Sequence, residues 1–420
     1  MTMSEWSKTK LGNIAETTSG GTPDRKNQAF FGGSIPWVKS GELEDTFIND
    51  TEEKITPEGL KRSAAKLFPS GTLLMAMYGA TVGKTALLKI EATTNQAVCA
   101  IFPRADQAGT DFLRYALVYQ RPEILKLRYG GAQPNISQQV IRNLVVPLPP
   151  LVEQRKIASV LGLVQRAIEQ QEQLVALTTE LKKSLMHKLF TEGLRGERQK
   201  QIEIGPMPES WEVLKLGDLF DTQLGKMLSQ KARAGDDPKP YLRNKNVQWG
   251  AIDTTDLLSM DFNERERGKF ILVPGDLLIC EGGEPGRAAI WRGALRECYY
   301  QKALHRLRPK SDTISNEFFA HLLEFALRYQ DLYGVAGASS TIAHLPEVQL
   351  KMLPVPLPSR NEQDTMVESI DAVDNKIALH QSKHAALTAL FRTCLHQLMT
   401  AQIRVHDLDL SFLEQEAVAS

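Results

Sequence analysis

Cysteines, long apolar segments and a net charge are what this sequence lacks. Its four cysteines, Cys99, Cys280, Cys298 and Cys394, form no CxxC pair, which argues against a disulfide framework or a cysteine-bound metal. No run of about 18 apolar residues occurs, as a membrane-spanning helix would need. The first residues lack the charged-then-apolar pattern of a secretory signal. We therefore expect a cytoplasmic protein that has no membrane partner.

The charges balance, with 50 Lys and Arg against 50 Asp and Glu. A chain that bound nucleic acid tightly on its own would usually be basic. Neutrality still permits DNA contact, because the charge near the phosphates decides it. The 420 residues, 42% of them hydrophobic, are enough for two to four packed domains.

An internal repeat of about 205 residues organises the chain. Matching anchors recur in the same order in both halves. They include Trp6 and Trp211, Pro36–Lys39 and Pro240–Arg243, Gly71–Leu74 and Gly275–Leu278, and Val146–Pro149 and Val355–Pro358. Because the offset drifts by only a few residues, the sequence predicts two copies of one fold.

Each copy begins with about 150 residues of short apolar runs, such as Thr72–Tyr78, broken by Gly, Pro, Asn and Asp, which predict strands. A proline-rich stop and a helix of about 40 residues follow. Both helices carry a heptad-like apolar stripe. Its members include Ile157, Leu161, Val164 and Ile168 in the first helix, and Ile370, Val373, Ile377 and Leu387 in the second. The predicted class is α+β, with the two helices packed on each other or, alternatively, each on its own domain.

Motifs for catalysis and for metal binding fail on inspection. Three residues separate the glycines of Gly79–Thr85 where a phosphate loop has four between them, so a tight turn between strands is the better interpretation. His380 and His384 lack the glutamate and third ligand of a zinc protease. The nuclease-like letters Glu52-Glu53-Lys54 are common in charged loops. We expect no catalytic residue, no metal and no cofactor on this chain.

A family resemblance rests on the central segment. Phe190–Gly196, Ile204–Trp211 and Lys215–Asp218 resemble the middle of type I restriction–modification specificity subunits, and the Pro-Leu-Pro stretches that lead to Glu-Gln at 147–154 and 356–363 match that family's helix starts. The resemblance covers essentially the whole chain. One departure is Ser359-Arg360-Asn361 after the second stretch, where the first has Pro-Leu-Val.

The resemblance implies the domain plan and the partners. It implies target recognition domains at 1–150 and 211–358, spacer helices at 151–190 and 359–402 that pair as an antiparallel coiled coil, a linker at 191–210 and a tail at 403–420. The implied partners are double-stranded DNA, two modification (methyltransferase) subunits that carry S-adenosylmethionine, and restriction subunits that use ATP and Mg.

Under this hypothesis two different readers recognise a two-part, asymmetric DNA site. Polar residues at turns and strand ends are the expected contacts, because Arg, Lys, Asn and Gln read base edges and hold phosphates. In the first copy they are Lys39, Ser40, Tyr78, Lys84, Gln96, Arg128, Gln133 and Asn135. In the second copy they are Arg243, Asn244, Lys245, Arg287, Gln301, Lys302 and Ser339.

One further expectation concerns the helix middles. Gln171 and His380 interrupt the two stripes at matching places, and a polar core position can fix helix register. We expect their side chains to meet. Two alternatives stay open: a coiled-coil scaffold whose domains bind proteins, and a specificity subunit for a fused restriction–modification enzyme.

Overall fold

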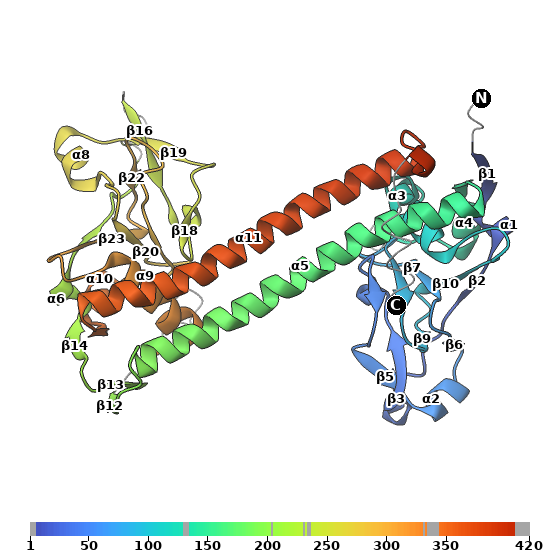
Figure 1. Ribbon diagram of the computed structural model, residues 1–420, viewed down its shortest axis with the longest axis horizontal. Helices are drawn as coiled ribbons and strands as arrows, with labels where there is room; N and C mark the ends of the chain where they lie inside the picture. Colours follow the sequence, from blue (N-terminus) through green and yellow to red (C-terminus); the bar gives the residue numbers. More distant parts are fainter. Residues whose placement is uncertain are drawn as a thin grey trace. The chain divides into compact units, whose positions relative to one another are not determined.

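The computed structural model describes residues 6–128, 134–202, 205–229, 232, 237–330, 332–333 and 344–407. The chain forms two compact units (Figure 1). Unit 1 comprises Met1–Gln171 and Lys383–Ser420, and unit 2 comprises Glu172–Ser382. Each unit therefore holds one globular domain together with a segment of each long helix.

Unit 1 is built on two mixed sheets. The larger has the order β2 (Ala15–Ser19), β10 (Val98–Pro103), β7 (Leu73–Ala76), β8 (Thr85–Leu88), β4 (Phe47–Ile48). The smaller has the order β5 (Glu53–Ile55), β3 (Phe31–Val38), β9 (Ala92–Thr94), β6 (Leu67–Phe68), and β1 (Ser7–Lys10) pairs with β11 (Val145–Leu148). The α-helices of the domain are α1 (Leu11–Ile14), α2 (Pro57–Lys61), α3 (Thr110–Lys126) and α4 (Gln138–Asn143). Every residue of β7 and β8 is buried, as expected of short apolar strands covered on both faces.

Unit 2 repeats this plan. Its main sheet has the order β15 (Phe220–Leu224), β23 (Leu304–Pro309), β20 (Leu277–Cys280), β21 (Ala288–Ile290). Smaller sheets comprise β19 (Leu258–Asp261), β16 (Pro238–Leu242) and β22 (Tyr299–Tyr300); β17 (Val247–Gln248) and β18 (Ala251–Ile252); β14 (Glu212–Lys215) and β24 (Pro354–Leu357); and β12 (Gln199–Ile202) and β13 (Gly205–Pro208). The helices are α6 (Leu216–Leu219), α8 (Glu264–Phe270), α9 (Asn316–Leu323) with the π-helical η4 (Glu324–Tyr329), and α10 (Glu347–Met352). The orders β2-β10-β7-β8 and β15-β23-β20-β21 match, which confirms the internal repeat.

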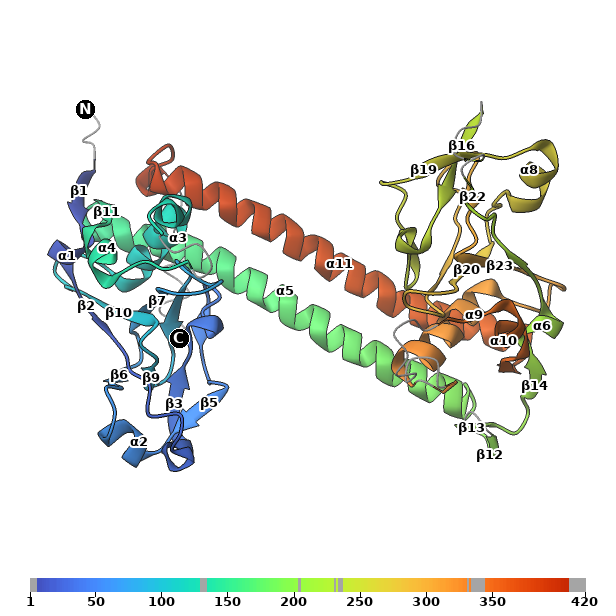
Figure 2. The ribbon, with the colours of Figure 1, turned by 180° about the vertical axis from the view of Figure 1, so that it is seen from behind.

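Two long helices, α5 (Leu151–Glu192) and α11 (Arg360–Met399), contribute to both units. Within each unit their segments run antiparallel and side by side (Figures 1 and 2). In unit 1, Ile157 and Leu161 of α5 pack with Leu395 of α11 and also with Tyr115 of α3. The predicted class, with two α/β domains and two antiparallel helices, is confirmed, and the buried stripe contacts both the other helix and the globular domain.

Apart from Ile157, Leu161 and Ile370, the predicted stripe is only partly buried. In unit 2, Ile370 is 1% exposed and lies in the main core. The remaining predicted members are half-buried: Val164, Ile168, Val373, Ile377 and Leu387. Gln171 belongs to unit 1 and His380 to unit 2, so their meeting stays a prediction. None of the helices in the described ranges combines the length and apolar character that crossing a membrane requires.

A glutamine near the start of each long helix fastens it to its domain. In unit 1, Gln154 accepts a hydrogen bond from the Gly109 N–H at 2.9 Å and donates to the carbonyl oxygens of Gln107 (3.0 Å) and Pro149 (2.8 Å). Both polar ends of a buried amide are thereby satisfied. The glutamine of the Glu-Gln pair after the first proline stop is thus explained by its buried hydrogen bonds.

Unit 2 carries the equivalent contacts. Gln363 accepts from the Ser315 N–H at 2.9 Å and donates to the carbonyl oxygens of Thr313 (3.0 Å) and Pro358 (2.9 Å). Gln154 and Gln363 are 1% and 0% exposed. The two units therefore anchor their helices by the same three hydrogen bonds.

Candidate nucleic-acid interface

The first component of the candidate site is a short helical turn after a strand whose last two residues are buried. In unit 1 this cation turn consists of Lys39 and η2 (Ser40–Glu42), and in unit 2 of Arg243 and η3 (Asn244–Asn246). The Lys39 N–H donates to Glu42 Oε1 at 2.8 Å, and the Arg243 N–H donates to Asn246 Oδ1 at 3.0 Å. Both cations thus begin a capped turn whose backbone is fixed.

The second component is the glycine turn, residues 79–84 in unit 1 and 282–287 in unit 2. Gly79 and Gly83 have φ of 83° and 77°, and Gly283 and Gly286 have φ of 77° and 86°. This left-handed region is accessible mainly to glycine. The turns connect antiparallel strands, β7 to β8 and β20 to β21, and no helix follows. The sequence prediction of a tight turn between strands is confirmed.

The third component is the polar loop before the long helix, residues 134–136 in unit 1 and 344–345 in unit 2. In unit 1 the Gly79 N–H donates to the Pro134 carbonyl at 3.1 Å, and Tyr78 forms a bridge with Asn135. In unit 2 Gly282 forms the corresponding bridge with His344. The loop therefore lies beside the glycine turn in both units.

Side chains also join the cation turn to the glycine turn. Thr81 Oγ1 donates to the Ser40 carbonyl at 2.7 Å in unit 1. In unit 2 Asn244 Nδ2 donates to the Gly282 carbonyl at 2.8 Å, and Arg287 Nη2 donates to the Asn244 carbonyl at 2.7 Å. Three segments that are distant in sequence thus meet at one place in each unit. This site gathers most of the predicted contact residues: Lys39, Ser40, Tyr78, Lys84 and Asn135, and Arg243, Asn244, Lys245 and Arg287.

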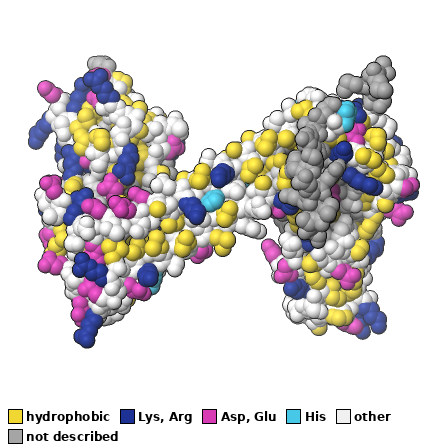
Figure 3. Space-filling view, in the orientation of Figure 1, with side chains coloured by type: hydrophobic (Ala, Val, Ile, Leu, Met, Phe, Trp, Pro, Cys, Tyr) yellow, Lys and Arg dark blue, Asp and Glu magenta, His cyan; other side chains and the backbone are white. Residues whose placement is uncertain are grey.

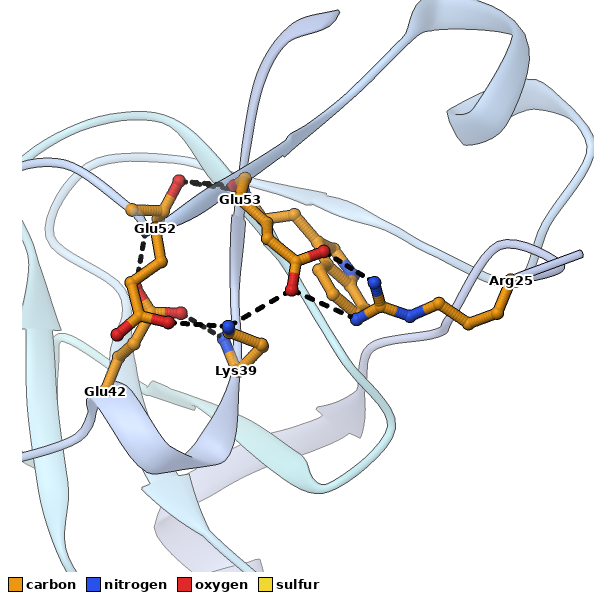
Figure 4. Close-up of polar contacts among 7 residues, drawn as sticks. Arg25, Lys39, Glu42, Glu52 and Glu53 are labelled. Carbon is orange, nitrogen blue, oxygen red and sulfur yellow. Dashed lines mark hydrogen bonds and ion pairs between the residues drawn. The ribbon is translucent and has the colours of Figure 1, made fainter. Parts of the chain in front are cut away.

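The cations of unit 1 are held by carboxylates (Figure 4). Lys39 Nζ lies 2.6 Å from Glu52 Oε2 and 3.1 Å from Glu53 Oε1. Hydrogen bonds to Glu52 and then to Glu53 raise the pKa of Lys39 above its ordinary value. Glu53 also accepts from Arg25 at 2.6 Å, and this contact is the main reason its pKa is lowered. Lys84 pairs with Glu44 in the same way.

The cations of unit 2 are paired as well. Arg243 Nη2 donates to the Asp256 carbonyl at 2.7 Å and lies 3.4 Å from its carboxylate, which also pairs with Lys245. Arg287 lies 3.2 Å from Glu284. Figure 3 shows basic and acidic side chains intermixed over both globular domains. The local charge at the site is therefore close to balanced.

The other predicted contacts lie farther along the chain. Gln96 is exposed and accepts from Thr22. Arg128 and Lys302 are exposed. The Gln301 N–H donates to the Leu242 carbonyl at 3.1 Å, directly before the cation turn. Gln133 and Ser339 lie outside the described residues.

Sequence reasoning missed the counterpart of Gln301. In unit 1 the Asn95 N–H donates to the Val38 carbonyl at 2.9 Å, as Gln301 does to Leu242. The pairings Val38 with Thr94 and Leu242 with Tyr300 confirm this register. Asn95 thus corresponds to Gln301, whereas the sequence prediction named its neighbour Gln96 as a contact residue.

Sequence reasoning set Glu52 and Glu53 aside as residues of a charged loop and did not name Asp256, so it did not assign these carboxylates to the site. A signal was present, because Glu52 follows Lys39 by 13 residues and Asp256 follows Arg243 by 13 residues. Attention to basic and amide side chains alone passed over it. The shared spacing makes these acidic residues part of the repeated site.

One group among the described residues resembles a metal site. The ligand atoms of His321, Asp371 and Asp374 lie within 4.8 Å of one another. However, His321 bonds Asp371 at 2.9 Å, and the Lys182 ammonium lies 2.8 Å from Asp374. The cation already beside this group would repel a metal ion.

Known proteins share this architecture. A model of the type I restriction modification DNA specificity domain matches residues 3–178 and 208–389. The MjaVIII specificity subunit of a type I restriction enzyme from Methanocaldococcus jannaschii is 24% identical over 418 residues, covering 96% of this chain and 94% of that protein. The EcoR124I/EcoR124II specificity subunit from Escherichia coli is 29% identical over 163 residues, covering 37% of this chain and 40% of that protein.

A solved structure agrees with the fold. The S subunit of a type I restriction–modification system from M. genitalium superposes with a TM-score of 0.62 at 18% identity, covering 95% of this chain and 97% of that one. The family model spans most of this chain in two copies, one over each half of the repeat. The chain therefore belongs to the family of type I restriction–modification DNA specificity subunits.

Proposed function

We propose that this chain chooses the DNA sequence on which a type I restriction–modification complex acts, with one half of a two-part site read by each unit. The observation that carries the proposal is the duplicated site. The same three segments meet in both units, but their side chains differ: Ser40 in unit 1 corresponds to Asn244 in unit 2, and Asn135 corresponds to His344. Two units that share a backbone arrangement but present different side chains would recognise two different half-sites, as an asymmetric DNA site requires.

Some side chains of the site would position the DNA, and others would recognise its bases. Lys and Arg side chains hold phosphates, which fixes orientation without carrying sequence information. Asn244, in the capped turn of unit 2, carries an amide of the type that pairs with adenine in the major groove once it leaves the Gly282 carbonyl, and an arginine such as Arg287 suits guanine. The fixed turn backbones reduce the ordering cost when these side chains meet base edges.

Membership of the specificity-subunit family suggests which proteins this chain assembles with. We propose that two modification subunits and the restriction subunits assemble on this chain, and that they carry S-adenosylmethionine, ATP and Mg. The near-neutral local charge supports this division, because a reader whose partners supply phosphate contacts needs less positive charge of its own. The chain then contributes recognition and assembly, and the chemistry belongs to its partners.

Selection from randomised DNA tests the proposal. The full chain, assembled with a type I modification subunit, is incubated with random duplexes, and the retained DNA is sequenced. We expect two short elements separated by a gap of constant length. Retention of DNA without a shared sequence, by a complex that assembles normally, would favour a protein-binding scaffold instead.

A matched pair of variants locates the readers. Asn244→Ala should relax one element, and Asn135→Ala should relax the other, each by about 1–3 kcal/mol of base discrimination. Asn361→Ala, at the exposed start of α11, is the control and should change neither. If both site variants altered the same element, the assignment of one half-site to each unit would be wrong.

A further inference from the structure

We propose that Glu52, Glu53 and Asp256 are specificity-determining residues, whose carboxylates hold the reading cations in the DNA-free protein and thereby weaken binding to DNA of the wrong sequence. The inference rests on the proposed function. It assigns a role to acidic groups at a site that must bind a polyanion. Such groups are otherwise unexpected there, because like charges repel.

The arrangement occurs twice, within separate units. In each unit the cation is the residue that begins the capped turn, Lys39 or Arg243, and the carboxylate of a residue 13 positions later lies beside it, at 2.6 Å in unit 1 and 3.4 Å in unit 2. Where unit 1 has Lys39 and Glu52, unit 2 has Arg243 and Asp256. The opposite charges are thus present in both copies although the residue types differ.

Exposure shows which partner an approaching phosphate meets first. The Lys39 side chain is 28% exposed and that of Glu52 is 70% exposed. The Arg243 side chain is 19% exposed and that of Asp256 is 56% exposed. In both units the carboxylate is the more solvent-accessible member. A DNA strand that approaches from solvent therefore meets a carboxylate before it reaches Lys39 or Arg243, whereas Lys245 is as exposed as Asp256 (55% and 56%).

The energetic consequence differs between wrong and right sequences. An exposed ion pair adds little to folding, but it must be broken before the cation can bind phosphate. On DNA of the wrong sequence nothing offsets that loss or the repulsion of the displaced carboxylate. On the right sequence, base contacts offset it, and a carboxylate can itself accept a hydrogen bond from a cytosine amino group. The carboxylates therefore increase specificity by weakening binding to DNA of the wrong sequence.

The test compares Asp256→Asn with the unmodified chain, each assembled with the modification subunit, on the selected sequence and on random DNA across a salt series. The Asp256 carboxylate pairs with both Arg243 and Lys245, so the variant removes a negative charge from beside two cations, while Arg243 keeps its 2.7 Å hydrogen bond to the Asp256 carbonyl. We expect random DNA to bind about 3- to 10-fold tighter and the salt slope to steepen by about 1–2. The ratio of specific to random affinity should fall.

Unit 1 gives an independent test with a graded result. Glu52→Gln alone should have a small effect, because Glu53 still holds Lys39 at 3.1 Å. Glu52→Gln combined with Glu53→Gln should approach the effect of Asp256→Asn. This ordering follows from the contacts, and a simple change of net charge would not give it.

Asp364→Asn is the matched control. Asp364 pairs with Arg360 at 2.9 Å on the first turn of α11 and is 48% exposed, so the variant changes net charge equally away from the site. Equal tightening by Asp256→Asn and Asp364→Asn, or equal tightening on specific and random DNA, would overturn the inference. If the unmodified complex preferred no sequence, the proposed function itself would fail.

Discussion

Replacing Gln363 with leucine should loosen α11 from the domain of unit 2. The Gln363 side chain is buried, and its three hydrogen bonds reach the Ser315 N–H and the carbonyl oxygens of Thr313 and Pro358. Ser315 is also the N-cap of α9, where its hydroxyl accepts from the Phe318 N–H. The loss therefore affects the beginning of two helices at once.

The magnitude follows from the contacts. A hydrogen bond within a protein contributes about 1 kcal/mol net, so three contribute about 3 kcal/mol. Leucine has a similar volume but satisfies none of the buried partners, so little of this loss is recovered. Gln154→Leu removes the equivalent three bonds in unit 1 and should cost about the same there.

Hydrogen–deuterium exchange of the full chain measures each unit separately. Gln363→Leu should speed exchange in peptides of α9 and the first turns of α11, and Gln154→Leu in peptides of α3 and the first turns of α5. Gln381→Leu, at an exposed position of α11, serves as the control. Equal effects of Gln363→Leu and Gln381→Leu would refute the reasoning.

Three further outcomes are expected. Lys182→Met should destabilise unit 2 by about 1–3 kcal/mol in urea unfolding, because Glu324 is 6% exposed and loses its 2.7 Å partner but still pairs with Arg328 at 2.8 Å. Adding Glu324→Leu should recover part of the loss. Burial would raise the pKa of Glu324, but Lys182 and Arg328 outweigh burial and lower this pKa below 4.5. The extra stability of the unmodified chain over Lys182→Met should therefore persist above pH 4.5 and decrease as the pH falls further. Burial lowers the pKa of His305 below 6.5. The free energy of unfolding of unit 2 should therefore fall by at most about 1.4 kcal/mol per pH unit as the pH drops below 6.5. An equal fall in the His305→Phe variant would contradict this. Lys302→Ala should weaken binding to all DNA sequences alike and lower the salt slope by about 1, which a salt series on two sequences would check.

Features set by residue spacing could be predicted from the sequence. The matched anchors predict two copies, and the 3.5-residue stripe predicts the long helices, because both depend on spacing alone. The glycine turns were also predictable, since the positive φ at Gly83 and Gly286 limits the choice of residue. These features need no knowledge of which segments meet.

Contacts between distant segments could not be predicted. That Ile157 packs on both α11 and α3 depends on how the domain meets the helix. The equivalence of Asn95 with Gln301 depends on strand register. The pairing of Lys39 with Glu52 needs the turn and the following strand to be folded. A sequence shows which charges exist, but folding decides which of them meet.

Methylation mapping in cells tests the central claim most directly. A plasmid is recovered from cells that make the modification subunit with the unmodified chain, with the Asn244→Ala variant, or without the chain, and its methylated bases are located. The account predicts methylation in one two-part motif with a constant gap, a change in one part only for Asn244→Ala, and no methylation without the chain. The same methylation pattern in all three cultures would contradict it.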